Sequence, residues 1–145
     1  MIEEITSADH PTVEAITALL SQLTSHPCTF GEEELQRIVA DPASHLFVAR
    51  IDEKVVAMLT LGDYSSPTGR KAWVEDVVVD EAFRGRGLGR ELVEFAIQYC
   101  KTHLAPCTLM LTSNPTRVAA NELYRSSGFE QKITNVYKLN CPDNE

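Results

Sequence analysis

Hydrophobic residues recur at a helical spacing in residues 11–23 and again from Leu88 onward. Between and around these segments lie β-branched, apolar runs, which predict strands. Those runs occupy residues 2–5, 46–51, 54–61, 72–80 and 107–112. Asp52 and Glu53 separate two of them and predict a hairpin turn. The alternation of the two spacings indicates a domain that mixes helices with a sheet.

Local signals add three elements. Thr29 precedes Glu32 by three residues, a capping-box spacing, and predicts a helix over 29–40 that stops at Asp41-Pro42. Asn114-Pro115 predicts the start of another helix, which ends near Gly128. Residues 129–139 predict one or two final strands. The expected order is β-α-α-β-β-β-α-β-α-β(-β), an α/β (α+β) fold.

Composition limits the classes of protein that this chain can represent. Its 145 residues, 43% of them hydrophobic, fit one domain spanning 1–145 without repeats or low-complexity stretches. No apolar run is long enough for a membrane span, and the N-terminus has no secretory signal, so a cytoplasmic location is expected. The formal net charge of -8 argues against general binding to nucleic acid or to anionic membranes.

The cysteines do not predict a metal site. Cys28, Cys100, Cys107 and Cys141 show no CxxC spacing. Cys100, His103 and Cys107 lie close together in the chain, but no fourth ligand is placed to complete a tetrahedral site. Free thiols in a reducing compartment, and no metal, are expected.

A glycine-rich turn at residues 84–90, RGRGLGR, carries the clearest chemical signal. Glycines let backbone N–H groups approach a ligand, and the N-terminus of the following helix favours anions. Three arginines in seven residues contrast with the overall negative charge. The turn lacks the Gly-Lys-Ser/Thr of a Walker A loop, and Arg90 stands where a dinucleotide fingerprint requires glycine. The turn therefore predicts a phosphate site of another kind.

These residues resemble the acyl-CoA signature of the GNAT superfamily of N-acetyltransferases. Arg84, Gly87 and Gly89 match its three specified positions, and Val79 stands five residues before Arg84. A second signature, a helix with Leu-Tyr that closes on Gly-Phe, is similar to ANELYRSSGF at 120–129. The resemblance implies a central mixed, mostly antiparallel sheet flanked by about four helices, with a splayed strand that binds acetyl-CoA.

The resemblance also implies roles for individual residues. Coenzyme A would contact the strand, the turn, Asn121 and Tyr124. The strand and turn residues are Val77, Val78, Val79, Arg84, Gly85, Arg86, Gly87, Leu88, Gly89 and Arg90. The N–H of Val77 would bind the acetyl oxygen, and Tyr124 would protonate the leaving thiolate. Many relatives carry Asn where this chain has Arg117, and the resemblance leaves open which residue makes the hydrogen bond to coenzyme A. In one interpretation Asn121 makes this hydrogen bond. Asn114 could instead simply cap the helix.

Glu75 is the candidate general base, expected on the same strand face as Val77 if the strand is regular. A bulge would reverse the facing of Asp76. The competing explanation is an ion pair of Glu75 with Arg70 or Lys71.

The acceptor side is less defined. Tyr64, Trp73, Asp63 and His26 are candidates without specific support. The expected function is acetyl-CoA-dependent acetylation of a primary amine, most simply on a small molecule, in a ternary complex. The alternatives are an acyl-CoA-binding module without transferase activity and a nucleotide-binding module. A homodimer is left open.

Overall fold

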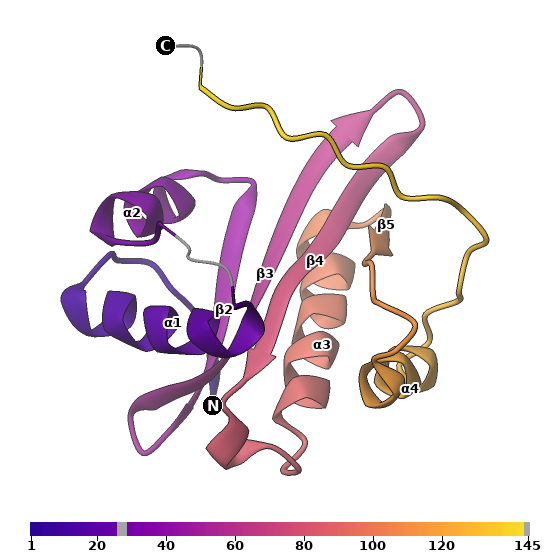
Figure 1. Ribbon diagram of the computed structural model, residues 1–145. Helices are drawn as coiled ribbons and strands as arrows, with labels where there is room; N and C mark the ends of the chain where they lie inside the picture. Colours follow the sequence, from indigo (N-terminus) through magenta and orange to yellow (C-terminus); the bar gives the residue numbers. More distant parts are fainter. Residues whose placement is uncertain (26–28, 144–145) are drawn as a thin grey trace.

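An antiparallel meander forms the centre of the sheet in the computed structural model, which describes residues 1–25 and 29–143 (Figure 1). Its strands are β2 (Ser44–Ile51), β3 (Lys54–Ser66) and β4 (Gly69–Val79). β1 (Ile2–Glu4) pairs antiparallel with β2, and β5 (Cys107–Met110) pairs parallel with β4. The order β1-β2-β3-β4-β5 gives the mixed, mostly antiparallel sheet that the sequence predicts.

Helices cover both faces of this sheet (Figure 1). α1 (His10–Leu23) and α2 (Glu32–Ala40) pack on one face, around Leu19, Leu35 and Val48. α3 (Leu88–Tyr99) and α4 (Val118–Ser126) pack on the other, around Phe47, Leu92 and Tyr124. A 3₁₀ turn, Glu81–Phe83, connects β4 to the glycine turn, and a π-helical turn, Cys100–Leu104, extends α3. The two apolar cores hold β4 between α1 and α3.

Most predicted elements are confirmed, and the hairpin turn is clear. Asp52 and Glu53 both have positive φ, 50° and 67°, as a two-residue turn between twisted antiparallel strands requires. The predicted cap at Thr29 is wrong. α2 begins at Glu32 behind an extended Gly31, and no side chain caps it. Three glutamates in its first turn favour the positive end of the helix dipole.

The start of α4 also differs from the prediction. Asn114 accepts a hydrogen bond from the Thr116 N–H at 2.9 Å, so it closes a local turn. The helix itself begins only at Val118. The prediction placed it earlier because Asn followed by Pro is typical of a turn as well as of a helix start. β5 ends at Met110, two residues earlier than predicted. Gly128 follows the helix end with φ 104°, the left-handed conformation expected there.

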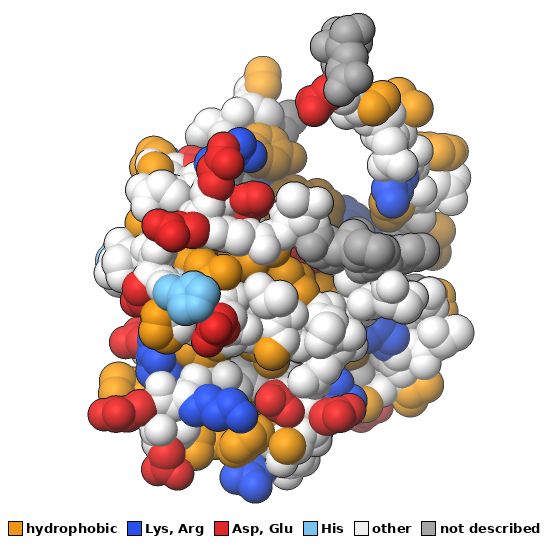
Figure 2. Space-filling view, turned by 60° about the vertical axis from the view of Figure 1, so that its left-hand side comes forward, with side chains coloured by type: hydrophobic (Ala, Val, Ile, Leu, Met, Phe, Trp, Pro, Cys, Tyr) orange, Lys and Arg blue, Asp and Glu red, His pale blue; other side chains and the backbone are white. Residues whose placement is uncertain are grey.

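The predicted final strands are not formed. Residues 130–143 are exposed and adopt no regular structure, and the segment runs clear of α4 and over the β3–β4 hairpin (Figure 1). Figure 2 shows it as an arm that stands off the rest of the surface and carries hydrophobic side chains. A strand needs a neighbour for its N–H and C=O groups, and this segment pairs with none of the five strands that the structure describes.

Candidate functional site

β4 parts from β5 halfway along its length. The two strands pair only from Arg70–Cys107 to Trp73–Met110, while β4 continues to Val79. From Val74 onward, β4 keeps β3 on one edge, and none of the strands in the described part of the chain lies on the other. This is the splayed strand that the sequence comparison with acetyltransferases implies. Its open edge leaves backbone groups available to an extended ligand.

A β-bulge changes the facing of β4 inside this open stretch. Thr60 pairs with Glu75 and Met58 with Val78, so two residues of β4 oppose one of β3. Asp76, in the bulge, has φ 51°. Val74 belongs to the core under α3, whereas Val78 belongs to the core under α1.

The bulge overturns one expectation. Val77 and Val79 pack toward α3, while Glu75, next to Val74, faces the α1 side of the strand. The prediction that Glu75 shares a face with Val77 is therefore wrong. The sequence does not reveal the bulge, because Val77, Val78 and Val79 are all apolar. Whichever of them face a given side of the sheet, apolar side chains are buried there.

The glycine turn has the backbone form that an anion site needs. Gly85 and Gly87 both have φ 81°, and the space where a Cβ would stand at either is empty to 4 Å. Gly87 is the N-cap of α3 and contributes no side-chain cap. The first N–H groups of α3 thus have no partner within the helix and face the turn.

The arginine side chains fix this turn to its surroundings. Arg84 donates to the last carbonyl of β4, Val79 O, at 3.1 Å. Arg86 lies over the Phe83 ring at 4.9 Å. Arg90 donates to Ser126 Oγ at 2.8 Å and so connects the start of α3 to the end of α4. The sequence predicts these arginines as ligand contacts; the structure shows, in addition, that they position the turn.

Tyr124 lies at the meeting point of α4, α3 and the sheet. Its side chain is only 7% exposed and packs edge-to-face on Phe129, with ring centroids 6.1 Å apart. Burial raises the pKa of the Tyr124 phenol, and the nearby Arg117 charge opposes that rise. The phenol is consequently a protonated hydrogen-bond donor at neutral pH.

Asn121 has a structural contact of its own. Its Nδ2 donates to the carbonyl of Asn114 at 3.1 Å, which holds the turn before α4. One donor of the amide is therefore used within the chain, and its carbonyl oxygen remains the group that a ligand could meet.

Glu75 is exposed, and within residues 1–25 and 29–143 it forms no ion pair. The competing explanation, pairing with neighbouring cations, is not observed. Lys71 donates to Ser66 Oγ at 2.8 Å, and Arg70 donates to Leu104 O at 3.4 Å. Glu75 thus keeps a free carboxylate beside the open edge of β4.

The acceptor-side candidates do not form one group. Tyr64 is 52% exposed near the hairpin end, and Trp73 is half-buried at the last β4–β5 pair. Asp63 is engaged with His45. His26 lies outside the described residues.

Sequence reasoning missed a polar cluster around His45, which is 7% exposed. Its Nδ1 lies 3.0 Å from Glu4 Oε2, and its Nε2 lies 3.3 Å from Asp63 Oδ2. The Tyr99 hydroxyl is 3.3 Å from Nδ1, and burial, followed by the charges of Glu4 and Asp63, raises the pKa of Tyr99. The sequence signal for this cluster was His45 itself, a polar residue near the start of an otherwise apolar strand. The cluster joins β1, β2, β3 and α3.

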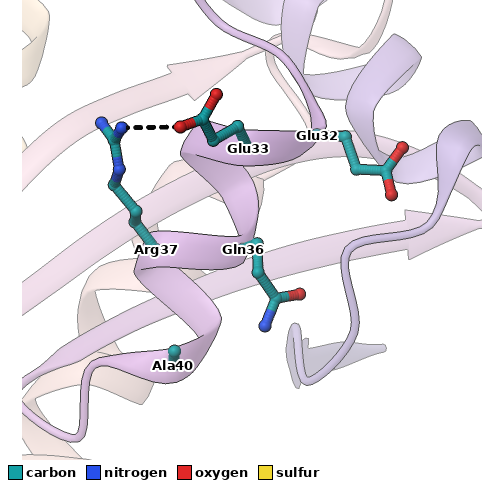
Figure 3. A pocket seen from close by; sticks show the side chains of 5 residues that line it. All are labelled: Glu32, Glu33, Gln36, Arg37 and Ala40. Atoms are coloured by element: carbon teal, nitrogen blue, oxygen red, sulfur yellow. Dashed lines mark hydrogen bonds and ion pairs between the residues drawn. The ribbon is translucent and has the colours of Figure 1, made fainter.

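A surface hollow of about 620 Å³ lies over α2, away from the predicted site (Figure 3). Its lining comes from that helix alone: Glu32, Glu33, Gln36, Arg37 and Ala40. Arg37 pairs with Glu33 at 2.9 Å within the same helix. None of the predicted site residues contributes to this hollow.

The described part of the chain contains no helix of the length and hydrophobicity that crossing a bilayer would need. It also contains no group of three or more His, Cys, Asp or Glu side chains arranged to hold a metal ion.

Comparison with known proteins gives a consistent family. Residues 13–129 match the acetyltransferase (GNAT) family. A glucosamine 6-phosphate N-acetyltransferase of Oryza sativa subsp. japonica is 28% identical over 137 residues, covering 91% of this chain and 72% of that protein. One of Arabidopsis thaliana is 50% identical over 34 residues, 23% of each chain. A putative acetyltransferase from Agrobacterium tumefaciens superposes with a TM-score of 0.83 at 27% identity, covering 97% and 99% of the two chains.

Proposed function

The chain belongs to the acetyltransferase (GNAT) family, and from that premise we propose that it moves an acetyl group from acetyl-CoA to a primary amine of a small molecule. The observation that carries the proposal is the open edge of β4, which leads directly into the glycine turn at the start of α3. An extended thioester with a pyrophosphate at one end suits this combination of an unpaired strand edge and an anion site.

Cofactor binding divides between backbone and side chains. The N–H groups of residues 85–90 bind the pyrophosphate, and the edge from Val77 to Val79 pairs with the pantetheine arm as a strand would. The N–H of Val77 donates to the acetyl oxygen, where negative charge develops during attack. Asn121 offers its amide oxygen to the same arm.

Glu75 prepares the nucleophile. An alkylammonium must lose a proton before its nitrogen attacks the acetyl carbon, and the free Glu75 carboxylate accepts that proton through water. Because the bulge turns Glu75 to the α1 side of β4, the amine approaches from that side, while the cofactor lies along the edge.

Tyr124 completes the transfer. The amine nitrogen bonds to the carbonyl carbon, the carbon–sulfur bond breaks, and the thiolate takes the phenolic proton. The nitrogen then loses its second proton, which returns through water to the Tyr124 phenolate. Burial, which raises the pKa of Tyr124, keeps that proton on the phenol until the sulfur becomes basic. The products are an acetamide and free coenzyme A.

The relatives indicate where to begin with acceptors. The Oryza protein is named a glucosamine 6-phosphate N-acetyltransferase, so amino-sugar phosphates are the first acceptors to test. The acidic chain, with its formal charge of -8, is also compatible with cationic amines. A cytoplasmic location remains part of the same proposal.

The test is thiol release from acetyl-CoA across a panel of amino sugars, amino-sugar phosphates, polyamines, aminoglycosides and peptides. We expect at least one amine to release coenzyme A above the hydrolytic background and to yield the acetamide by mass. Tyr124→Phe keeps the ring and its packing, and we expect its turnover to fall about ten- to hundredfold, the loss of one charge-assisted hydrogen bond. Acetyl-CoA binding without acetylation of any amine would contradict the proposal and support a non-catalytic module.

A further inference from the structure

Six residues at the hairpin end of β3 and β4 share the sheet face on which Glu75 lies. They form three directly opposed pairs: Thr60 with Glu75, Gly62 with Trp73, and Tyr64 with Lys71. Directly opposed residues point to the same side of a sheet, and Glu75 faces the α1 side, so all three pairs face that side. This end of the hairpin extends beyond α1 and α2 (Figure 1). Two acceptor-side candidates, Tyr64 and Trp73, therefore lie on one face with the candidate base.

Trp73 has a flat surface that the fold does not use. It is the only tryptophan of the chain, it is half-buried, and neither of the two apolar cores described above includes it. Its partner across the strands is Gly62, where an added Cβ would meet only the carbonyl oxygen of Ala43, at 3.9 Å. A glycine opposite the indole leaves space above the sheet. A large aromatic side chain beside such a space can pack against the ring of a ligand.

Lys71 places a cation at the hairpin end of the same face. Its ammonium donates to Ser66 Oγ at 2.8 Å, to the Gly69 carbonyl at 3.1 Å and to the Thr68 hydroxyl. None of the ion pairs within residues 1–25 and 29–143 includes Lys71. An ammonium beside two hydroxyls, with only neutral acceptors, suits a phosphate or a similar anion.

Lys71, Trp73 and Glu75 follow one another along β4 at every second residue, so the Cα atoms of the outer two lie roughly 13 Å apart. We propose that this face binds the acceptor, and that the acceptor is a ring-containing amine with an anionic group at its far end, as in an amino-sugar phosphate. The amine lies at Glu75 and the ring packs on Trp73. The anion binds Lys71 and the hydroxyls of Ser66 and Thr68. This inference rests on the proposed function, in which Glu75 deprotonates the amine.

The charge of the chain makes the place of Lys71 important. A formal net charge of -8 repels an anionic acceptor, so a local cation is needed to hold one. Arg70, the neighbouring cation, points to the opposite face and donates to Leu104 O at 3.4 Å. Arg70 therefore offers a matched control, with the same charge one residue away and outside the proposed site.

The emission of Trp73 reports binding at this face without any transfer. With coenzyme A present, which has no acetyl group to donate, we expect glucosamine 6-phosphate to change the emission of the full-length protein saturably. Glucosamine and glucose 6-phosphate should bind more weakly, because each lacks one end, and inorganic phosphate should compete only with the phosphorylated sugars. Lys71→Met should raise the Kd for glucosamine 6-phosphate about ten- to hundredfold, the loss of charge-assisted hydrogen bonds, and leave that for glucosamine unchanged. Arg70→Met should bind both as the wild type does.

The outcomes separate this acceptor site from the transfer reaction. An emission that responds to none of these sugars, an affinity that does not depend on the phosphate, or equal losses in Lys71→Met and Arg70→Met would overturn the site. The phosphate competition in the wild type decides the question even if Lys71→Met does not fold. A site that binds as expected, with no acetamide formed from any amine, would refute the transfer and leave the site in place. Acetylation of amino sugars with the same KM with and without phosphate would support the transfer and refute the site.

Discussion

Replacing Gly87 and Gly89 by alanine, one at a time, should change stability in opposite directions. Gly87 has φ 81°, and nothing stands within 4 Å of the position of a new Cβ. The cost of Gly87→Ala is therefore in the backbone alone. For an L-residue in this left-handed conformation that cost is about 1–2 kcal/mol.

Gly89 differs in both respects. Its φ is negative, and an added Cβ would stand 3.7 Å from Val79 Cγ2 and 3.8 Å from Leu123 Cδ2, ordinary contact distances. Gly89→Ala should therefore stabilise the protein by about 0.4–1 kcal/mol, because it restricts the unfolded chain without strain in the folded one. A larger side chain at this site would press on Val79 and Leu123 rather than on a bound phosphate.

Urea denaturation of the two variants and the wild type measures the difference directly. In melting temperature, about 2–4 °C per kcal/mol is expected for a chain of this size. Titration with acetyl-CoA on the same samples should show weaker binding for Gly87→Ala, and nearly wild-type binding for Gly89→Ala. If Gly89→Ala destabilises the fold by more than 1 kcal/mol, or if Gly87→Ala is neutral, the assignment of backbone conformations in this turn is wrong.

Substitutions at three further positions test the strand and the core. Glu75→Gln should abolish the acidic limb of the rate–pH profile while the folded structure persists; an unchanged limb would assign the base elsewhere. Asp76→Val should destabilise the protein by about 1–3 kcal/mol, because a β-branched residue is strained at φ 51°, whereas Asp76→Gly should cost nothing measurable; equal losses by urea titration would refute the bulge. Burial raises the pKa of Cys100 from 9.0 to about 12, so this thiol destabilises the fold as the pH rises from 9 toward 12. Cys100→Ala should lose less stability over that interval than the wild type, and parallel pH curves would contradict this.

The sequence predicts correctly those features whose conformation depends only on residues within one short segment. The turn at Asp52 and Glu53, the helix from Leu88 and the left-handed Gly128 each depend on neighbours within a few residues, and each is confirmed. The backbone of the glycine turn belongs to the same class. Positive φ at Gly85 and Gly87 and a helix starting at Leu88 are all encoded in seven residues.

Features that depend on partners distant in the chain could not be predicted. The bulge depends on the pairing of β4 with β3, where two residues of β4 stand opposite Leu59. The sequence Val77-Val78-Val79 does not reveal it, because these apolar residues suit either face of the strand. His45 is buried because Glu4 and Asp63 come to it from other strands. Residues 129–139 have the pattern of strands, but none of the strands in the described ranges pairs with them.

In the proposed function, the bulge and the parting of β4 from β5 give the two reactants separate approaches to one strand. Without the bulge, Glu75 and Val77 would point to the same face of the strand. The extra residue at Asp76 turns Glu75 toward the α1 side and keeps Val77 and Val79 packed toward α3. The open edge between these two faces is then where a thioester along β4 and an amine from the α1 side can meet. Removing Asp76 from the chain makes Glu75 and Val77 neighbours in a regular strand, and neighbours alternate faces, so we expect Glu75 still to face the α1 side and the deletion to remove only the bulge.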